Sequence, residues 1–350
     1  MRCDKTCELP GASDLISLNK SCFCMTLGRA DLDEAILAHA GNDELSVLLA
    51  ARPNLFAATA VFVSPSDLGA MQAQVSAIEA VASLASYHDV ALARSNDIIF
   101  SAQTGARGLF MGYDFHTSEQ YLYPDMVLAK DLLARNGIET LILNPEALTY
   151  ENGVLAHGGR AIDMVYNRLT DFDLSEPGHA QLRAALLDEA VVISPAPRHH
   201  ALYANKRNLI WLSDPDSLKS FGADDADRQV LAAIPDTRRV TEDVADELWA
   251  TRRGYFFKPA AGFGSRAAYR GDKLTKRVWS AILEGDYIAQ ALVPPTVRAV
   301  TVDQEPVALK YDVRLYTYAG KTLLLAARVY QGQTTNFRTS GGGFAPVYQF

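Results

Sequence analysis

The sequence has no long hydrophobic run, and this absence argues against a membrane-spanning segment. No apolar stretch among its 350 residues approaches the roughly 20 residues that cross a bilayer. The first residues, MRCDKTCELPGASD, also lack the apolar core of a signal peptide. A net charge of −8 disfavours nucleic acids and anionic membranes as partners. We therefore expect a cytoplasmic protein that binds neither.

Cysteine is scarce, and histidine offers no metal-binding spacing. The cysteines lie close to the N-terminus, at Cys3, Cys7, Cys22 and Cys24. Their spacings, C-x3-C and C-x-C, fit no common zinc pattern, and the nearest histidine is His39. Reduced thiols are the favoured interpretation for a cytosolic protein, and a metal site is the alternative.

Two groups of nucleotide-binding signatures are absent. The sequence contains no G-x-x-x-x-G-K-[ST] loop, and it has no H-R-D or D-F-G motif. A phosphotransferase of the kinase type is therefore disfavoured.

The length and the hydrophobic pattern predict an α/β (α+β) protein with two or three lobes. Apolar residues recur at helical spacing over residues 30–95, and a short aromatic strand follows at residues 108–116. Strands then alternate with helices, which predicts a small parallel α/β domain. The last part is rich in tyrosine and valine strands, which favours antiparallel sheets. The expected division is a helical region over 1–118, the α/β domain over 119–204, and antiparallel lobes over 205–350.

The stretch FFKPAAGFGSRAAYRG, residues 256–271, predicts an anion-binding loop. Lys258 ends an apolar strand, and the loop after it contains Gly262 and Gly264. Arg266 and Arg270 follow. A lysine at a strand end beside a flexible cationic loop suits a phosphate group.

The C-terminal strands supply more positive charge. In KYDVRLYTY, Asp312 and Arg314 share one face because alternate residues of a strand do. Arg328 lies in the next strand, and Asn336 precedes three consecutive glycines. Simple pairing between Asp312 and Arg314 is one interpretation. The alternative is a cationic pocket, shared with Lys258, that suits a triphosphate.

The order of these elements resembles the ATP-grasp fold of glutathione synthetases and other carboxylate–amine ligases, over residues 120–350. The resemblance implies ATP and Mg²⁺ as cofactors, and a small-molecule carboxylate and an amine as substrates. It implies nucleotide contacts from Lys206, Lys258, Gly262, Gly264, Ser265, Gln290, Ala291, Leu292 and Asn336. It also implies that Arg314 and Arg328 are catalytic and hold the phosphates and an acyl-phosphate intermediate. The segment VYNRLTDF resembles a substrate-facing loop.

One part of the ATP-grasp pattern is displaced. Such lobes normally continue past the glycines to an aspartate strand and a Glu-x-Asn strand that bind magnesium, whereas this chain ends at Phe350. MGYDFH resembles the aspartate strand, so the sequence is similar to circularly permuted, glutathionylspermidine-synthase-like proteins. This resemblance places Asp114 beside Asp312 as a magnesium ligand. No Glu-x-Asn segment follows, because TSE leads directly into QYLYPD. The expected function is an ATP-dependent ligase impaired by this deletion, and the alternative is a catalytically weak nucleotide-binding protein.

Overall fold

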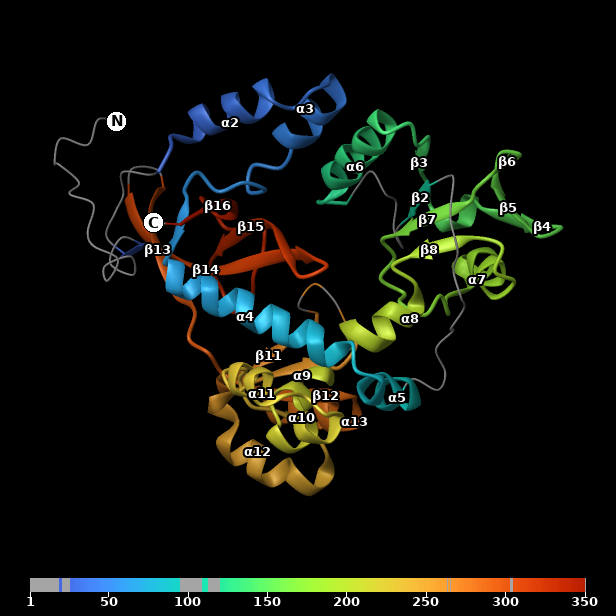
Figure 1. Ribbon diagram of the computed structural model, residues 1–350. Coiled ribbons are helices and arrows are strands. Elements are labelled where there is room, and N and C mark those ends of the chain that lie inside the picture. The colour runs from blue at the N-terminus through green and yellow to red at the C-terminus, as the bar shows by residue number, and fades with distance from the viewer. Residues whose placement is uncertain are drawn as a thin grey trace.

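The computed structural model describes residues 19–20, 26–94, 109–112, 120–262, 264, 266–302 and 305–349, and for 109–112 it describes the backbone alone. These residues form a mixed α/β protein built on four β-sheets. The sheet built mainly from residues 296–349 lies left of centre in Figure 1, with the lobe of residues 208–291 below it and the parallel sheet to the right. No described helix is long and apolar enough to span a bilayer.

The described N-terminal residues form helices, as expected, and one additional strand. The helices are α2 (Arg29–Ala38), α3 (Asp43–Ala50), α4 (Pro65–Ala82) and α5 (Ala85–Ala93). α4 begins where the side chain of Ser64 accepts a hydrogen bond from the Asp67 N–H, with Pro65 at the first helical position. The strand β1 (Val61–Val63) is buried and pairs in parallel with β16 (Gly343–Gln349). The N-terminal region therefore contributes one strand to the C-terminal sheet. The four cysteines, for which the sequence left a metal site as the alternative, all lie outside the described residues.

A small parallel sheet with helices confirms the expected α/β topology. Its order is β3 (Thr140–Ile142), β2 (Leu109–Gly112), β7 (Met164–Asn167), β8 (Val192–Ser194). The accompanying helices are α6 (Tyr123–Arg135) and α7 (Ala180–Leu187). A separate antiparallel sheet contains β4 (Thr149–Glu151), β5 (Val154–His157) and β6 (Arg160–Ala161). Asn152 and Gly153 have φ values of 53° and 78°, the backbone that a two-residue hairpin turn requires.

β2 corrects the prediction made for the MGYDFH segment. The sequence placed this strand beside the C-terminal sheet, but Leu109–Gly112 pairs in parallel with β3 and β7. The physical reason lies in its composition, because an uninterrupted apolar run such as LFMG suits a central parallel strand that is covered on both faces. Asp114 itself lies outside the described residues.

The lower lobe is built on an antiparallel sheet of β11 (Tyr269–Arg270), β10 (Tyr255–Pro259), β12 (Tyr287–Ala291) and β9 (Thr237–Arg239), in that order. The short helix α8 (Pro197–His199) precedes this lobe. The helices of the lobe are α9 (Asn208–Leu212), α10 (Pro215–Phe221), α11 (Asp225–Leu231), α12 (Ala245–Thr251) and α13 (Lys276–Glu284). Phe257, Trp279 and Ile282 are buried between this sheet and the helices. The opposite face of the sheet is left for the cleft described below.

The C-terminal sheet has the order β1-β16-β15-β14-β13, with β13 (Thr296–Val302), β14 (Glu305–Tyr318) and β15 (Lys321–Tyr330). Val61, Val300 and Val329 are buried together on one face. α4 contacts the same sheet, since Gln72 of α4 bonds to Thr322. The other face carries Lys310, Asp312 and Arg314 of β14 and Arg328 of β15. Consequently, the hydrophobic core fixes the direction in which these charges point.

Candidate functional site

A cleft of about 1660 Å³ lies between the lower-lobe sheet and the C-terminal sheet. Its described lining includes eight basic residues: Lys206, Lys258, Arg266, Arg270, Lys310, Arg314, Arg328 and Arg338. No described aspartate or glutamate lines it. The protein as a whole has a net charge of −8, so this cleft is a local region of positive potential. Such a region attracts an anionic ligand.

Lys258 lines the β10 side of this cleft. Residues 256 and 258 share a face of β10, and Phe256 lies opposite Gln290 of β12. The Lys258 Nζ donates a 2.7 Å hydrogen bond to Gln290 Oε1, and Gln290 Nε2 in turn donates to Thr237 Oγ1 at 3.3 Å. Burial, followed by the charge of Lys206, lowers the pKa of Lys258. The ammonium group therefore has a neutral amide as its partner in a partly desolvated site.

Lys206 is held against the glycine-rich loop. Its backbone N–H donates to Ala260 O at 2.9 Å, and its Nζ donates to Gly262 O at 2.8 Å. Gly262 and Gly264 have φ values of 152° and 57°, which favour glycine. Burial lowers the pKa of Lys206. Lys206 and Lys258 thus have backbone or amide oxygens as their described hydrogen-bond partners, an arrangement that a bound anion would stabilise.

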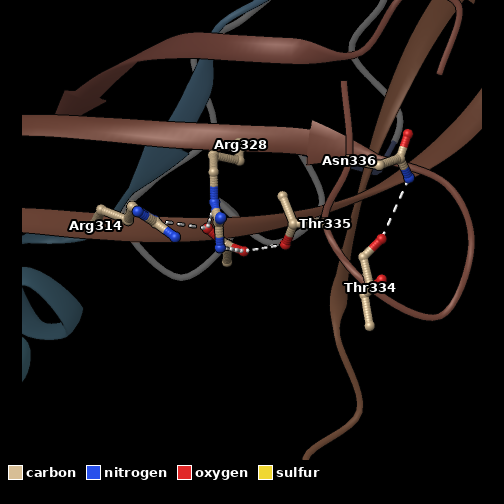
Figure 2. Close-up of polar contacts among 6 residues, drawn as sticks. Arg314, Arg328, Thr334, Thr335 and Asn336 are labelled. Carbon is tan, nitrogen blue, oxygen red and sulfur yellow. Dashed lines mark hydrogen bonds and ion pairs between the residues drawn. The ribbon is translucent and has the colours of Figure 1, made fainter. Parts of the chain in front are cut away.

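Arg314 and Arg328 line the same cleft and converge on one carboxylate (Figure 2). Arg328 donates to both oxygens of Asp312, from Nε at 2.9 Å and from Nη2 at 2.7 Å. Thr335 Oγ1 donates to the same group at 3.1 Å, while Arg314 Nε lies 3.8 Å from it. Asp312 therefore pairs mainly with Arg328, not with its neighbour in the strand. Arg314 retains donors for a ligand.

Of the two predicted magnesium ligands, the structure describes Asp312 alone. Both oxygens of Asp312 accept hydrogen bonds from Arg328, which leaves this carboxylate fewer lone pairs for a metal. The described residues include no group of three or more His, Cys, Asp or Glu side chains that could hold a metal. Mg²⁺ usually keeps several waters and binds through one or two carboxylates together with substrate phosphates, so the predicted pair of aspartates stays a prediction. Asp114, the other predicted ligand, lies outside the described residues.

Asn336 shapes the loop between β15 and β16. Its Nδ2 donates to the carbonyl of Gln331 at 2.6 Å. It also donates to the carbonyl of Thr334 at 3.2 Å, the contact drawn in Figure 2. Its Oδ1 accepts from the N–H of Arg338 at 2.9 Å and from Thr339 Oγ1 at 3.0 Å. Asn336 lines the cleft, but its amide is engaged within the loop. A direct phosphate contact from Asn336 remains a prediction.

The predicted hinge residues line the cleft, with their N–H groups already bonded. Gln290, Ala291 and Leu292 are all at its surface. The N–H of Ala291 donates to Asp236 O at 2.7 Å, and that of Leu292 donates to Gly254 O at 2.8 Å. These donors are therefore not open to an adenine ring. Ser265 lies outside the described residues.

Sequence reasoning missed an aromatic wall of the cleft. Tyr121 stacks on Phe337, with ring centroids 5.5 Å apart and an interplanar angle of 21°. Arg52 holds this wall in place, because its guanidinium donates to the carbonyls of Tyr121 at 2.6 Å and Gln120 at 2.7 Å. More than 200 residues separate the two stacked rings in the sequence. No local pattern indicates their contact.

A second cavity of about 470 Å³ adjoins the cleft at Gly262, which lines both. The loop after β7 forms one wall and is organised by the buried carboxylate of Asp171. Asp171 accepts from His179 Nδ1 at 2.6 Å, from the Glu176 N–H at 2.8 Å and from Ser175 Oγ at 3.2 Å. Burial raises the pKa of Asp171, but hydrogen bonds from Glu176, Asp173, His179 and Ser175 outweigh it and lower the pKa to about 2.

The change Asp171→Asn is expected to lower the free energy of unfolding at pH 7 by about 2 kcal/mol, because the folded-state pKa lies well below its ordinary value. A depressed carboxyl pKa stabilises the fold above pH 4 and loses that contribution as the pH falls toward 2. Urea unfolding at pH 7 and pH 2.5 should therefore show a smaller difference between wild type and variant at the acidic pH. Asp216→Asn, at an exposed position of α10, is the control. A difference that stays the same at both pH values would contradict this origin.

No family model matches the sequence, and none of the curated proteins matches it. Solved structures show distant similarity. A glutathione synthetase-like effector from Globodera pallida is 14% identical, with a TM-score of 0.41 over 70% of this chain. The ATP-grasp ligase PsnB, complexed with a minimal precursor, is 15% identical, with a TM-score of 0.35 over 64% of this chain and 76% of its own.

A protein from Methylobacillus flagellatus described as a gamma-glutamylcysteine synthetase is 11% identical, with a TM-score of 0.42 over 67% of this chain and 65% of its own. The chain spans 57% of the length of the Globodera effector. Similarities at this level of identity and TM-score do not transfer an activity. The cleft and its charges must therefore carry the functional conclusion.

Proposed function

We propose that this chain binds ATP in the cationic cleft and acts as an ATP-grasp-type carboxylate–amine ligase. The observation that supports this most is the lining of the cleft, with eight basic residues and no described acid. The polyphosphate of ATP supplies the matching negative charge. In this proposal residues 205–350 hold the nucleotide, and residues 119–204 contribute the substrate domain.

The proposed reaction has two steps. An oxygen of the substrate carboxylate attacks the γ-phosphorus, the bond to ADP breaks, and an acyl phosphate forms. The amine nitrogen then attacks the acyl carbon, inorganic phosphate leaves, and the nitrogen releases a proton. Negative charge accumulates on the transferring phosphoryl group, and in this proposal Lys258 and Arg314, which both line the cleft, neutralise it. Asp312 holds the guanidinium of Arg328 in a fixed orientation beside them.

Release of ADP in the presence of both substrates tests this activity. We expect ADP and phosphate to accumulate when ATP is combined with a pool of carboxylates and a pool of amines. Either pool alone should give much less. The measurement is a coupled ADP assay followed by division of the active pools, and equal ADP release without any acid or amine would contradict the ligase.

A nucleotide-binding protein with weak or no turnover is the second candidate. The pairing of Asp312 with Arg328 favours it, since Arg328 competes with a metal for the carboxylate oxygens. Calorimetric titration with ATP, with and without Mg²⁺, separates the two candidates when it is combined with the ADP assay. Tight binding without turnover in any pool would favour the second.

A further inference from the structure

The hairpin of β14 and β15 extends beyond the rest of the C-terminal sheet. β13 pairs with β14 only as far as Tyr311, and β16 pairs with β15 only from Ala326 to Val329. Residues 312–325 therefore form a two-stranded ribbon, to which no other strand of the described chain is paired. A two-stranded ribbon by itself is only marginally stable in water, so it depends on packing against its faces.

Helix α4 supports one face of this ribbon. Thr317 Oγ1 donates to Glu79 Oε1 of α4 at 3.3 Å, and Gln72 Nε2 of α4 donates to Thr322 Oγ1 at 3.3 Å. Thr317 and Thr322 lie opposite each other in the two strands, so both belong to the face that α4 contacts. The residues on either side of Thr317 in β14 point to the other face, because side chains alternate along a strand.

The face away from α4 carries exposed apolar side chains. Tyr316 and Tyr318 flank Thr317, and their side chains are 40% and 74% exposed. Leu324 lies opposite Tyr316, and the register shift beside this pair leaves Leu323 as an additional residue of β15. A bulge of this kind sets two residues of one strand against one residue of the other. Both leucines are more than half exposed.

The last strand of the sheet adds a third tyrosine. Pro346 of β16 lies opposite Ala326 of β15. Tyr348 and Leu324 are each two residues further along their strands, so they share one face of the sheet. We call the whole set the tip patch: Tyr316, Tyr318, Leu323, Leu324 and Tyr348. These five are a third of the fifteen large hydrophobic residues that are exposed in the described chain, so exposed apolar surface is concentrated here.

The area of the tip patch is large enough for a protein interface. A fully buried aromatic side chain covers 150–250 Å², so five large side chains that are 40–74% exposed present roughly 500 Å² to solvent. Contiguous apolar patches above a few hundred Å² mark interaction surfaces. A stable interface buries about 800 Å² on each partner. The tip patch therefore supplies more than half of the surface that such an interface needs.

We propose that the tip patch is the contact surface of a homodimer, in which the patches of two copies of this chain meet face to face about a twofold axis. Such an interface uses the same surface on both copies, and homodimer interfaces are more apolar than other interfaces. None of the five side chains is charged, so the patch complements itself and selects no partner of opposite charge. The cations Arg314 and Lys321 lie at its margin.

The mass in solution tests the homodimer. Sedimentation equilibrium over a range of protein concentrations should show the mass rising from the 38.1 kDa of one chain to twice that value. The double change Tyr318→Glu and Leu324→Glu should raise the dissociation constant of the dimer about tenfold or more, because it buries charge in the interface. The matched control, Val47→Glu and Leu187→Glu, adds the same two charges at exposed positions of α3 and α7 and should leave the dimer unchanged.

A pair of opposite charges tests the twofold symmetry. Leu324 lies between Tyr316 and Tyr348 in the middle of the patch, so its two copies would meet near the axis. Leu324→Glu and Leu324→Lys should each weaken their own dimer, and an equimolar mixture of the two should recover it.

Circular dichroism verifies that each variant is folded, and no measurement involves ATP, so the result is independent of the proposed ligase function. A wild type that stays monomeric would overturn the homodimer, and sedimentation of that monomer with phosphatidylcholine vesicles would instead assign the patch to a lipid surface. A dimer that the two glutamates leave intact, or a mixture that stays monomeric, would also contradict the proposed contact.

Discussion

Replacement of Lys258 by methionine is expected to weaken ATP binding by about 1.5–3 kcal/mol, the range of a charge-assisted hydrogen bond in a partly buried site. Methionine preserves most of the apolar stem and removes the ammonium group. The side chain points into the cleft, where its only described hydrogen-bond acceptor is the neutral amide of Gln290. A phosphate oxygen would be a stronger partner. Isothermal titration calorimetry with ATP measures the change.

Lys219→Met is the matched control, because Lys219 is exposed on α10 and does not line the cleft. It removes the same charge and should leave the ATP affinity unchanged. Lys258→Arg retains the charge and should recover part of the loss. An unchanged affinity in a folded Lys258→Met protein would show that Lys258 is not a nucleotide contact.

The strands and the cationic cleft could be predicted because their signals are local. The alternation in KYDVRLYTY places Asp312 and Arg314 on the same face of the strand. The hydrophobic core covers the opposite face of the sheet, so these two charged side chains face the cleft. Lys258 follows from the apolar strand that ends at it. The helix–strand alternation likewise indicated the parallel sheet. Each of these inferences depends on residues within a few positions of one another.

Long-range pairing could not be predicted from such local signals. β1 has three residues beside an alanine-rich stretch, so its parallel pairing with β16 depends on contacts almost 300 residues apart. The same limit applies to β2, whose apolar run fits several sheets, and which the ATP-grasp resemblance assigned to the wrong one. The glycine triplet is a further case. A Cβ at Gly343 would lie 2.8 Å from backbone atoms of Asn54 and Leu55, so close packing against the N-terminal segment requires glycine there.

Arg298 is expected to give the largest loss of stability of any change considered. Its side chain is fully buried in β13. The guanidinium donates to the carbonyls of Ala60 at 2.7 Å, Ala299 at 2.8 Å and Asn19 at 3.3 Å. It therefore ties β13 to the segment that leads into β1. Arg298→Ala should lower the free energy of unfolding by about 3–5 kcal/mol, because it leaves buried carbonyls without donors and creates a cavity.

Urea unfolding followed by circular dichroism measures this loss, with Arg253→Ala at an exposed position as the control. Arg298→Met separates the two contributions, since methionine fills most of the space but donates no hydrogen bond. If the carbonyl bonds dominate, the methionine variant should lose nearly as much stability as the alanine variant. A loss below about 1 kcal/mol for Arg298→Ala, typical of a surface substitution, would contradict the anchoring of β1 through this side chain.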